Sequence, residues 1–166
     1  MKAYEKGIGG KVMESFSDPF TIDDFFLYIS NFVTIEKCIG VMGILTPDFF
    51  EIDGCILWKN TESIAYREGK NNLAAKNASG KERYLNIFCV DDFFQKHEDV
   101  TDLNETEEDG IRKALYLKTV FARQIERYWR FALSECYPDK KFEFEISENG
   151  MADEDGVCLT FWQKTE

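Results

Sequence analysis

The side chain best suited to general acid–base chemistry in this chain is its single histidine, His97. A histidine that acts as a base needs a nucleophile or a bound substrate within hydrogen-bond reach. Cys89 is a candidate nucleophile, but His97 lies beside Glu98 and Asp99, in a charged stretch that we expect to be solvated. The chain also contains no G-x-S-x-G, P-loop, G-x-G-x-x-G or H-E-x-x-H motif. The sequence therefore identifies no catalytic residue and favours a function other than catalysis.

A second candidate for acid–base chemistry is a set of three carboxylates at the start of a predicted strand, those of Asp48, Glu51 and Asp53. Paired carboxylates can divide the roles of acid and base between them. In a strand, Glu51 and Asp53 would share one face, opposite Ile52. Two carboxylates on a solvated face are ordinary, so these residues would carry the chemistry only if the protein were an enzyme.

The cysteines show no metal-binding pattern. There are five, with no C-x-x-C pair and with one histidine as a further ligand. Zinc sites normally contain closely spaced pairs of ligands, so we predict no zinc site. Free thiols among apolar neighbours are typical of a reducing compartment, and we expect a cytoplasmic protein. The cysteines are Cys38, Cys55, Cys89, Cys136 and Cys158.

An acidic segment at 98–110 has some of the features of a calcium-binding loop. Asp102, Asn104 and Thr106 alternate as the ligands of an EF-hand do. However, the position that requires glycine is occupied by Glu107, and the position that requires glutamate is occupied by Lys113. The sequence therefore predicts no metal and no cofactor.

The long predicted helix that follows carries a basic stripe in an acidic chain. Arg123, Arg127 and Arg130 share one helical face. Guanidinium groups in this arrangement can bind a carboxylate or a phosphate, which would make these three residues an anion-binding site. The other interpretation is that they pair internally, either with the acidic segment or with Glu143 and Glu145.

The charge of the whole chain limits its partners. Its formal net charge is −11 and its pI is about 4.7. Such a surface repels nucleic acid and favours a basic protein partner. In size and charge the chain is similar to small acidic immunity and antitoxin proteins, although no motif carries this likeness. We predict a protein-interaction module, and the alternative is a module that binds a small anionic ligand through Arg123 or Arg127. The expected partner-binding residues are Glu105, Glu107, Glu108, Asp109, Asp153, Glu154 and Asp155.

The element that must position these groups is a helix at 111–136. Its apolar residues recur at helical spacing and include Ile111, Tyr128 and Trp129. Gly110 and Pro138 mark its two ends. We expect the rest of the chain to pack against this helix.

Strands are predicted at 50–59, 142–147 and 157–162, the last two forming a hairpin. Gly54, inside the first strand, would mark a bulge or a close approach of another backbone. The alternation of apolar and polar residues favours an antiparallel sheet of at least three strands with one solvated face. With helices on the other face, the predicted class is α+β.

The remaining helices are predicted with less regular patterns. They span 21–32, 34–45, 61–69 and 81–95, the last with a break near Asp91 as an alternative, and 38–45 could instead be a buried strand. Asp-Asp-Phe-Phe at 91–94 has the acidic residues that a helix start favours.

The organisation of the chain is predicted to be simple. We expect a loose arm at 1–16 and a single α+β domain at 17–166. No apolar run is long enough to span a membrane, and no secretory signal is recognisable.

Overall fold

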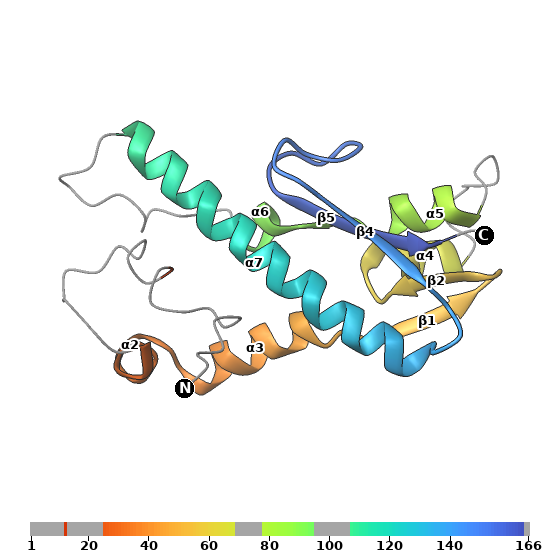
Figure 1. Ribbon diagram of the computed structural model, residues 1–166, viewed down its shortest axis with the longest axis horizontal. Helices are drawn as coiled ribbons and strands as arrows, with labels where there is room; N and C mark the ends of the chain where they lie inside the picture. Colours follow the sequence, from red (N-terminus) through yellow and green to blue (C-terminus); the bar gives the residue numbers. More distant parts are fainter. Residues whose placement is uncertain (1–11, 13–24, 69–77, 95–106, 165–166) are drawn as a thin grey trace, which may run out of the picture.

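The structure is a computed structural model that describes Val12 and residues 25–68, 78–94 and 107–164 (Figure 1). Apart from Val12, the predicted arm at 1–16 lies outside the described residues. His97 and the segment 98–106 also lie outside them.

The described residues form an α+β fold, as predicted. The helices are α2 (Phe25–Phe32), α3 (Ile35–Leu45), α4 (Thr61–Arg67), α5 (Ala78–Leu85), α6 (Val90–Phe93) and α7 (Glu107–Cys136). The strands are β1 (Phe49–Ile52), β2 (Cys55–Trp58), β3 (Phe88–Cys89), β4 (Phe142–Ser147) and β5 (Cys158–Gln163). Among the described helices, none combines the length and the apolar character needed to cross a membrane.

Helix α7 confirms the predicted long helix and begins four residues earlier, at Glu107. Its fully buried residues are Ala122, Ile125, Trp129 and Leu133. The predicted apolar stripe was too wide, because Ile111 is 64% exposed and Tyr128 is 45% exposed. The sheet, α3 and α6 contact the helix, and together they bury only a narrow stripe of it.

The predicted C-terminal hairpin is confirmed as β4 and β5, which belong to a three-stranded antiparallel sheet in the order β3-β5-β4. The central strand, β5, therefore pairs with both neighbours. Strand β3 is only two residues long and pairs Phe88 with Leu159 and Cys89 with Cys158. Beyond Leu159, the edge of β5 that faces β3 has no strand partner among the described strands.

The strand predicted at 50–59 is wrong: this segment is a hairpin of β1 and β2 that forms a separate two-stranded sheet. Asp53 and Gly54 form its two-residue turn, with φ angles of 52° and 76°. Asp-Gly favours this type of hairpin turn because both central positions need positive φ. Gly54 thus reverses the chain where a bulge was predicted, and Asp53 lies in the turn and not on a strand face beside Glu51.

The helix predicted at 81–95 is interrupted, as the alternative interpretation allowed, but the break lies at 86–89 and not near Asp91, which is part of α6. The chain leaves α5 after Leu85, forms β3, and enters the short helix α6 at Val90. Phe88 and Cys89 are buried and gain backbone pairing with β5, which outweighs the local helical pattern.

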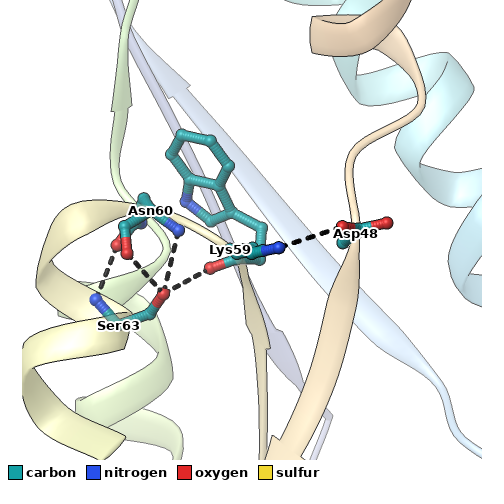
Figure 2. A network of polar contacts seen from close by, with 5 residues as sticks. Asp48, Lys59, Asn60 and Ser63 are labelled. Atoms are coloured by element: carbon teal, nitrogen blue, oxygen red, sulfur yellow. Dashed lines mark hydrogen bonds and ion pairs between the residues drawn. The ribbon is translucent and has the colours of Figure 1, made fainter. Parts of the chain in front are cut away.

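The other predicted helices agree with the structure. Segment 34–45 forms α3, not a strand, and Thr34 caps it by accepting a hydrogen bond from the Lys37 amide (3.3 Å). Gly40 and Gly43 do not mediate a close approach, because nothing lies within 4 Å of a Cβ placed on either. Helix α4 begins at a capping box in which Asn60 and Ser63 bond each other's backbone amides (Figure 2).

The core is centred on the Trp129 indole of α7. The rings of Phe49, Phe88 and Phe161 meet it edge to face, with centroids 5.8–5.9 Å apart. The Trp129 Nε1–H donates a hydrogen bond to the Ile44 carbonyl (2.8 Å), so its single polar atom is satisfied. Edge-to-face packing of this kind adds roughly 0.5–1.5 kcal/mol per aromatic pair beyond the area buried.

Two buried side chains, Glu82 of α5 and Asn86 just after it, join the two sheets, and we call them the polar bridge. Glu82 accepts hydrogen bonds from the backbone amides of Ile56 (2.7 Å) and Gln163 (2.7 Å). Asn86 donates to the carbonyls of Ile56 (2.9 Å) and Phe161 (3.1 Å). The polar bridge thus takes the place of a strand between β2 and the open side of β5.

Candidate functional site

A groove with a volume of about 310 Å³ lies between α6, the end of β2 and the β4–β5 connection, residues 148–157. Its apolar surface includes Trp58 and Phe93. Its polar side chains include Cys89, Asp92, Asp153 and Glu154. The volume falls at the lower end of the range for small-ligand and side-chain binding sites.

The β4–β5 connection has a defined backbone conformation. Met151 and Glu154 exchange two backbone hydrogen bonds, each 2.9 Å long, around a tight turn. Below this turn, the Gly150 amide donates to the Gly156 carbonyl (2.7 Å). The connection therefore continues the hairpin beyond the sheet and presents Asp153 and Glu154 at the groove.

Asp91 fixes this connection to the helices. Its carboxylate accepts a hydrogen bond from the Val157 amide (2.8 Å) and forms an ion pair with Lys118 of α7. Asp91 and Asp92 both lie in the first turn of α6, as the Asp-Asp-Phe-Phe pattern predicted. Their roles nevertheless differ, because Asp91 is held by the fold and Asp92 lines the groove.

The carboxylates of the groove have no cationic partner within the described part of the chain. Among the described residues, no basic side chain forms an ion pair with Asp92, Asp153 or Glu154. Three like charges that converge on a partly enclosed surface create a negative potential there. The arrangement therefore attracts a cation.

The aromatic part of the groove contains an unsatisfied donor. The Nε1–H of Trp58 is buried and has no hydrogen-bond acceptor within the described part of the chain. Beside it, Phe93 is 51% exposed and stacks on Phe88, with ring centroids 4.9 Å apart. An exposed aromatic ring next to carboxylates suits a cationic group that also carries apolar surface.

One thiol of the groove, that of Cys89, lies opposite a second, fully buried thiol, that of Cys158. Cys89 and Cys158 are direct partners across β3 and β5. Because Val90 donates its amide hydrogen to Val157 (2.8 Å), the cysteine pair occupies the neighbouring non-hydrogen-bonded position, where opposite side chains approach closely. Burial and the adjacent Cys89 thiol raise the pKa of the Cys158 thiol to about 12.

One group of ligand atoms in the groove could hold a metal ion. The Cys89 sulfur and one carboxylate oxygen each of Asp92 and Glu154 all lie within 4.8 Å of one another. These residues come from β3, α6 and the β4–β5 connection, so no local sequence pattern could have identified them.

The predicted partner-binding carboxylates occupy two separate places. Asp153 and Glu154 line the groove, and Asp155 follows them in the connection. Glu108 and Asp109 are exposed in the first turn of α7, where Asp109 pairs with Arg112 (2.8 Å). Figure 1 shows that α7 begins at one end of the molecule, away from the β4–β5 connection. Glu105 and the side chain of Glu107 lie outside the described residues.

None of the predicted anion-binding arginines of α7 lines the groove. Arg130 is exposed, pairs with Glu126 one turn earlier (2.8 Å) and lies over the Phe144 ring. Glu143 and Glu145 pair with Lys164 and Arg83 instead of with this stripe. An anion site at Arg123 and Arg127 remains a prediction.

The carboxylates that were considered for catalysis do not converge. Asp48 forms an ion pair with Lys59 (3.5 Å, Figure 2), and Glu51 forms one with Lys140 (3.0 Å). The Asp53 carboxylate accepts a hydrogen bond from the Tyr66 hydroxyl (3.2 Å). Each group has its own partner, so no acid–base pair forms there.

Sequence reasoning did not assign Asp92, Phe93 or Cys158 to a site. Their common signal is position, because each lies at or near the end of an element that borders the β4–β5 connection. Comparison of the chain with protein-family models, with curated proteins and with solved structures finds no match. The function is therefore inferred from the geometry of the groove.

Proposed function

We propose that the protein is a cytoplasmic interaction module that binds a basic segment of a protein partner in the groove. The observation that carries this proposal is the set of carboxylates Asp92, Asp153 and Glu154, which lack ion pairs with described residues. The net charge of −11 supports a basic partner and disfavours nucleic acid. The free cysteines support a reducing compartment.

The chemistry of the groove fits an arginine or lysine side chain. Its cationic group would lie among the three carboxylates, and its aliphatic stem would pack on Phe93. A backbone carbonyl of the same segment could accept from the Trp58 Nε1–H after a small adjustment of the ring. Among these contacts the ion pairs supply the association rate and the specificity.

The test uses a hexa-arginine peptide that carries a neutral fluorophore, with binding followed by fluorescence anisotropy. The groove variant combines Asp92→Asn, Asp153→Asn and Glu154→Gln. Each exposed ion pair contributes about 0.2–1 kcal/mol, so the variant should bind roughly tenfold more weakly. High salt should reduce the binding of the unmodified protein, because these charges are screened.

The matched control removes three negative charges elsewhere on the surface, through Glu108→Gln, Asp109→Asn and Glu135→Gln. It should retain nearly the affinity of the unmodified protein. Equal losses in both variants would mean that net charge alone attracts the peptide. A larger loss in the control would place the binding surface on α7. Either result would overturn the assignment to the groove.

A further inference from the structure

The inner end of the groove brings together three side chains that can ligate a metal ion, and a fourth, Cys158, is paired with one of them across the sheet. Cys89, Asp92 and Glu154 already lie within 4.8 Å of one another at their ligand atoms. Cys158 is the cross-strand partner of Cys89, and both thiols donate to the Asp155 carbonyl (3.1 Å and 3.8 Å). Two sulfurs and two carboxylate oxygens form a donor set that zinc accepts with tetrahedral geometry.

We propose that Cys89, Cys158, Asp92 and Glu154 bind a zinc ion at the inner end of the groove. Calcium and magnesium prefer oxygen ligands alone, so the two sulfurs select a thiophilic metal. The sequence argued against zinc because it lacks a C-x-x-C pair. The fold instead brings Cys89 and Cys158 together across β3 and β5, so a search for closely spaced cysteines in the sequence could not find this pair.

The distances are compatible with ligation after a small movement. Zinc binds sulfur at about 2.3 Å and carboxylate oxygen at about 2.0–2.2 Å, which places ligand atoms roughly 3.5 Å apart. The separations among Cys89, Asp92 and Glu154 are at most 4.8 Å, so closing them requires only a small shift of the carboxylates. Cys158 lies outside this group, and its thiol must also turn toward the metal. Asp92 and Glu154 are exposed, so they can move without breaking an ion pair with a described residue.

The electrostatics of the site also favour a cation. Asp92 and Glu154 each place a carboxylate oxygen within 4.8 Å of the Cys89 sulfur, so negative charge is concentrated at this point and like charges repel one another there. A divalent cation reverses this repulsion and stabilises both thiolates. The Cys89 thiol now donates to the Asp155 carbonyl (3.1 Å), a weak bond that metal ligation would replace.

The zinc site and the proposed peptide site share Asp92 and Glu154, but they can be tested separately. Asp153 lines the groove and is not among the four ligands, so Asp153→Asn should weaken peptide binding and leave metal binding unchanged. The cysteines contribute no charge to the peptide site, and their substitution should affect the metal alone. Failure of one proposal is therefore distinguishable from failure of the other.

The experiment is a titration of the reduced, full-length protein with Co²⁺, which reports zinc sites through its absorption spectrum. One equivalent should produce a thiolate-to-cobalt charge-transfer band and the intense visible bands of tetrahedral cobalt. One equivalent of Zn²⁺ should remove both. Absence of the charge-transfer band from the folded protein would overturn the proposal, as would octahedral bands alone.

Substitution of single ligands identifies the site. Cys89→Ser and Cys158→Ser should each reduce the charge-transfer band by half or more, whereas Cys136→Ser, which alters an exposed thiol, should leave it unchanged. Because buried cysteines can affect folding, Glu154→Gln provides a second variant on an exposed residue, with an expected affinity loss of at least about tenfold.

Two outcomes of these substitutions would contradict the proposal, and a third observation would exclude the site. One is a charge-transfer band that persists at full strength in the double variant Cys89→Ser, Cys158→Ser, since the metal would then bind elsewhere. The other is cobalt affinity that Glu154→Gln does not change. A Cys89–Cys158 disulfide in protein kept under reductant, detected by mass, would also exclude the site, because the thiolates would then be consumed.

Discussion

The polar bridge and the groove are neighbours, because Asn86 of the bridge accepts from the backbone amide of Trp58, which lines the groove (3.1 Å). They differ in whether their polar groups have partners. In the polar bridge, Glu82 is fully buried, and its oxygens accept from the backbone amides of Ile56 and Gln163 and from the Gln163 side chain (2.6–2.7 Å). In the groove, Asp92 and Glu154 have no ion pair with any described residue.

The two tryptophans show the same difference. The Trp129 indole donates to a backbone carbonyl, whereas the Trp58 indole, 5.4 Å away between ring centroids, has no acceptor within the described residues. Buried polar groups that are satisfied stabilise a fold, and groups left unsatisfied carry a free-energy penalty that a ligand can remove. The comparison teaches that missing partners, and not charge or burial alone, distinguish the proposed binding surface from the core.

The largest effect is expected where the polar bridge is broken. Glu82→Ala removes the acceptor that the amides of Ile56 and Gln163 share. Each unsatisfied buried group costs about 1–3 kcal/mol, so we expect a loss of about 3–5 kcal/mol in the free energy of unfolding. Urea denaturation followed by circular dichroism measures this loss.

The control for this variant is Glu135→Ala, on the exposed face near the end of α7. It should change the free energy of unfolding by no more than about 0.5 kcal/mol. If Glu82→Ala were as mild as this control, the two sheets would not depend on the polar bridge, and the contrast with the groove would fail.

An intermediate effect is expected at the base of the β4–β5 connection. Gly156 has a φ of +82°, and a Cβ at this position would overlap the Asp91 carboxylate. Gly156→Ala must therefore displace the residue that anchors the connection. We expect a loss of about 2–4 kcal/mol by urea denaturation, from backbone strain and from the weakened Asp91 contacts.

The matched control is Gly54→Ala in the β1–β2 turn. Gly54 has a similar φ of +76°, but nothing lies within 4 Å of the place that its Cβ would occupy. It should cost only about 1–2 kcal/mol, the strain of the left-handed conformation. Equal losses at the two glycines would show that Asp91 does not hold the connection.

The smallest effect, and one of opposite sign, is expected in the groove itself. Glu154→Gln removes one of several neighbouring negative charges and breaks no ion pair with a described residue. In metal-free protein the free energy of unfolding should stay within about 0.5 kcal/mol and should rise slightly. A loss above about 1 kcal/mol in the same urea experiment would mean that Glu154 supports the fold, and the groove would then resemble the polar bridge.

The sequence predicted those elements whose pattern is local. Helix α7 and the β4–β5 hairpin have regular apolar spacing, so both were found. The Asp53–Gly54 dipeptide is also a local signal for a hairpin turn, but the surrounding apolar residues were interpreted as one continuous strand. Strand β3 could not be found, because two residues have no period and Phe88 and Cys89 adopt strand conformation only through pairing with β5.

The candidate site was predicted only in part for the same reason. Asp153 and Glu154 were identified from local charge alone. Cys89 and Cys158 become neighbours only through the register of β3 on β5, which depends on tertiary packing. Asp92 was part of the Asp-Asp-Phe-Phe pattern, but the pattern could not show that Asp91 and Asp92 have different roles. That difference arises because Asp91 bonds the Val157 amide and pairs with Lys118.

The central position of β5 has a consequence for synthesis of the protein on the ribosome. Both β3 and β4 precede β5 in the chain, and each pairs with it. The polar bridge also lacks its partners Phe161 and Gln163 until β5 is made. At 5–20 residues per second, roughly 4–15 s separate the synthesis of Phe88 from that of Gln163. During this interval Phe88 and the polar bridge lack their partners in β5, so a chaperone that binds aromatic segments has time to bind this part of the chain.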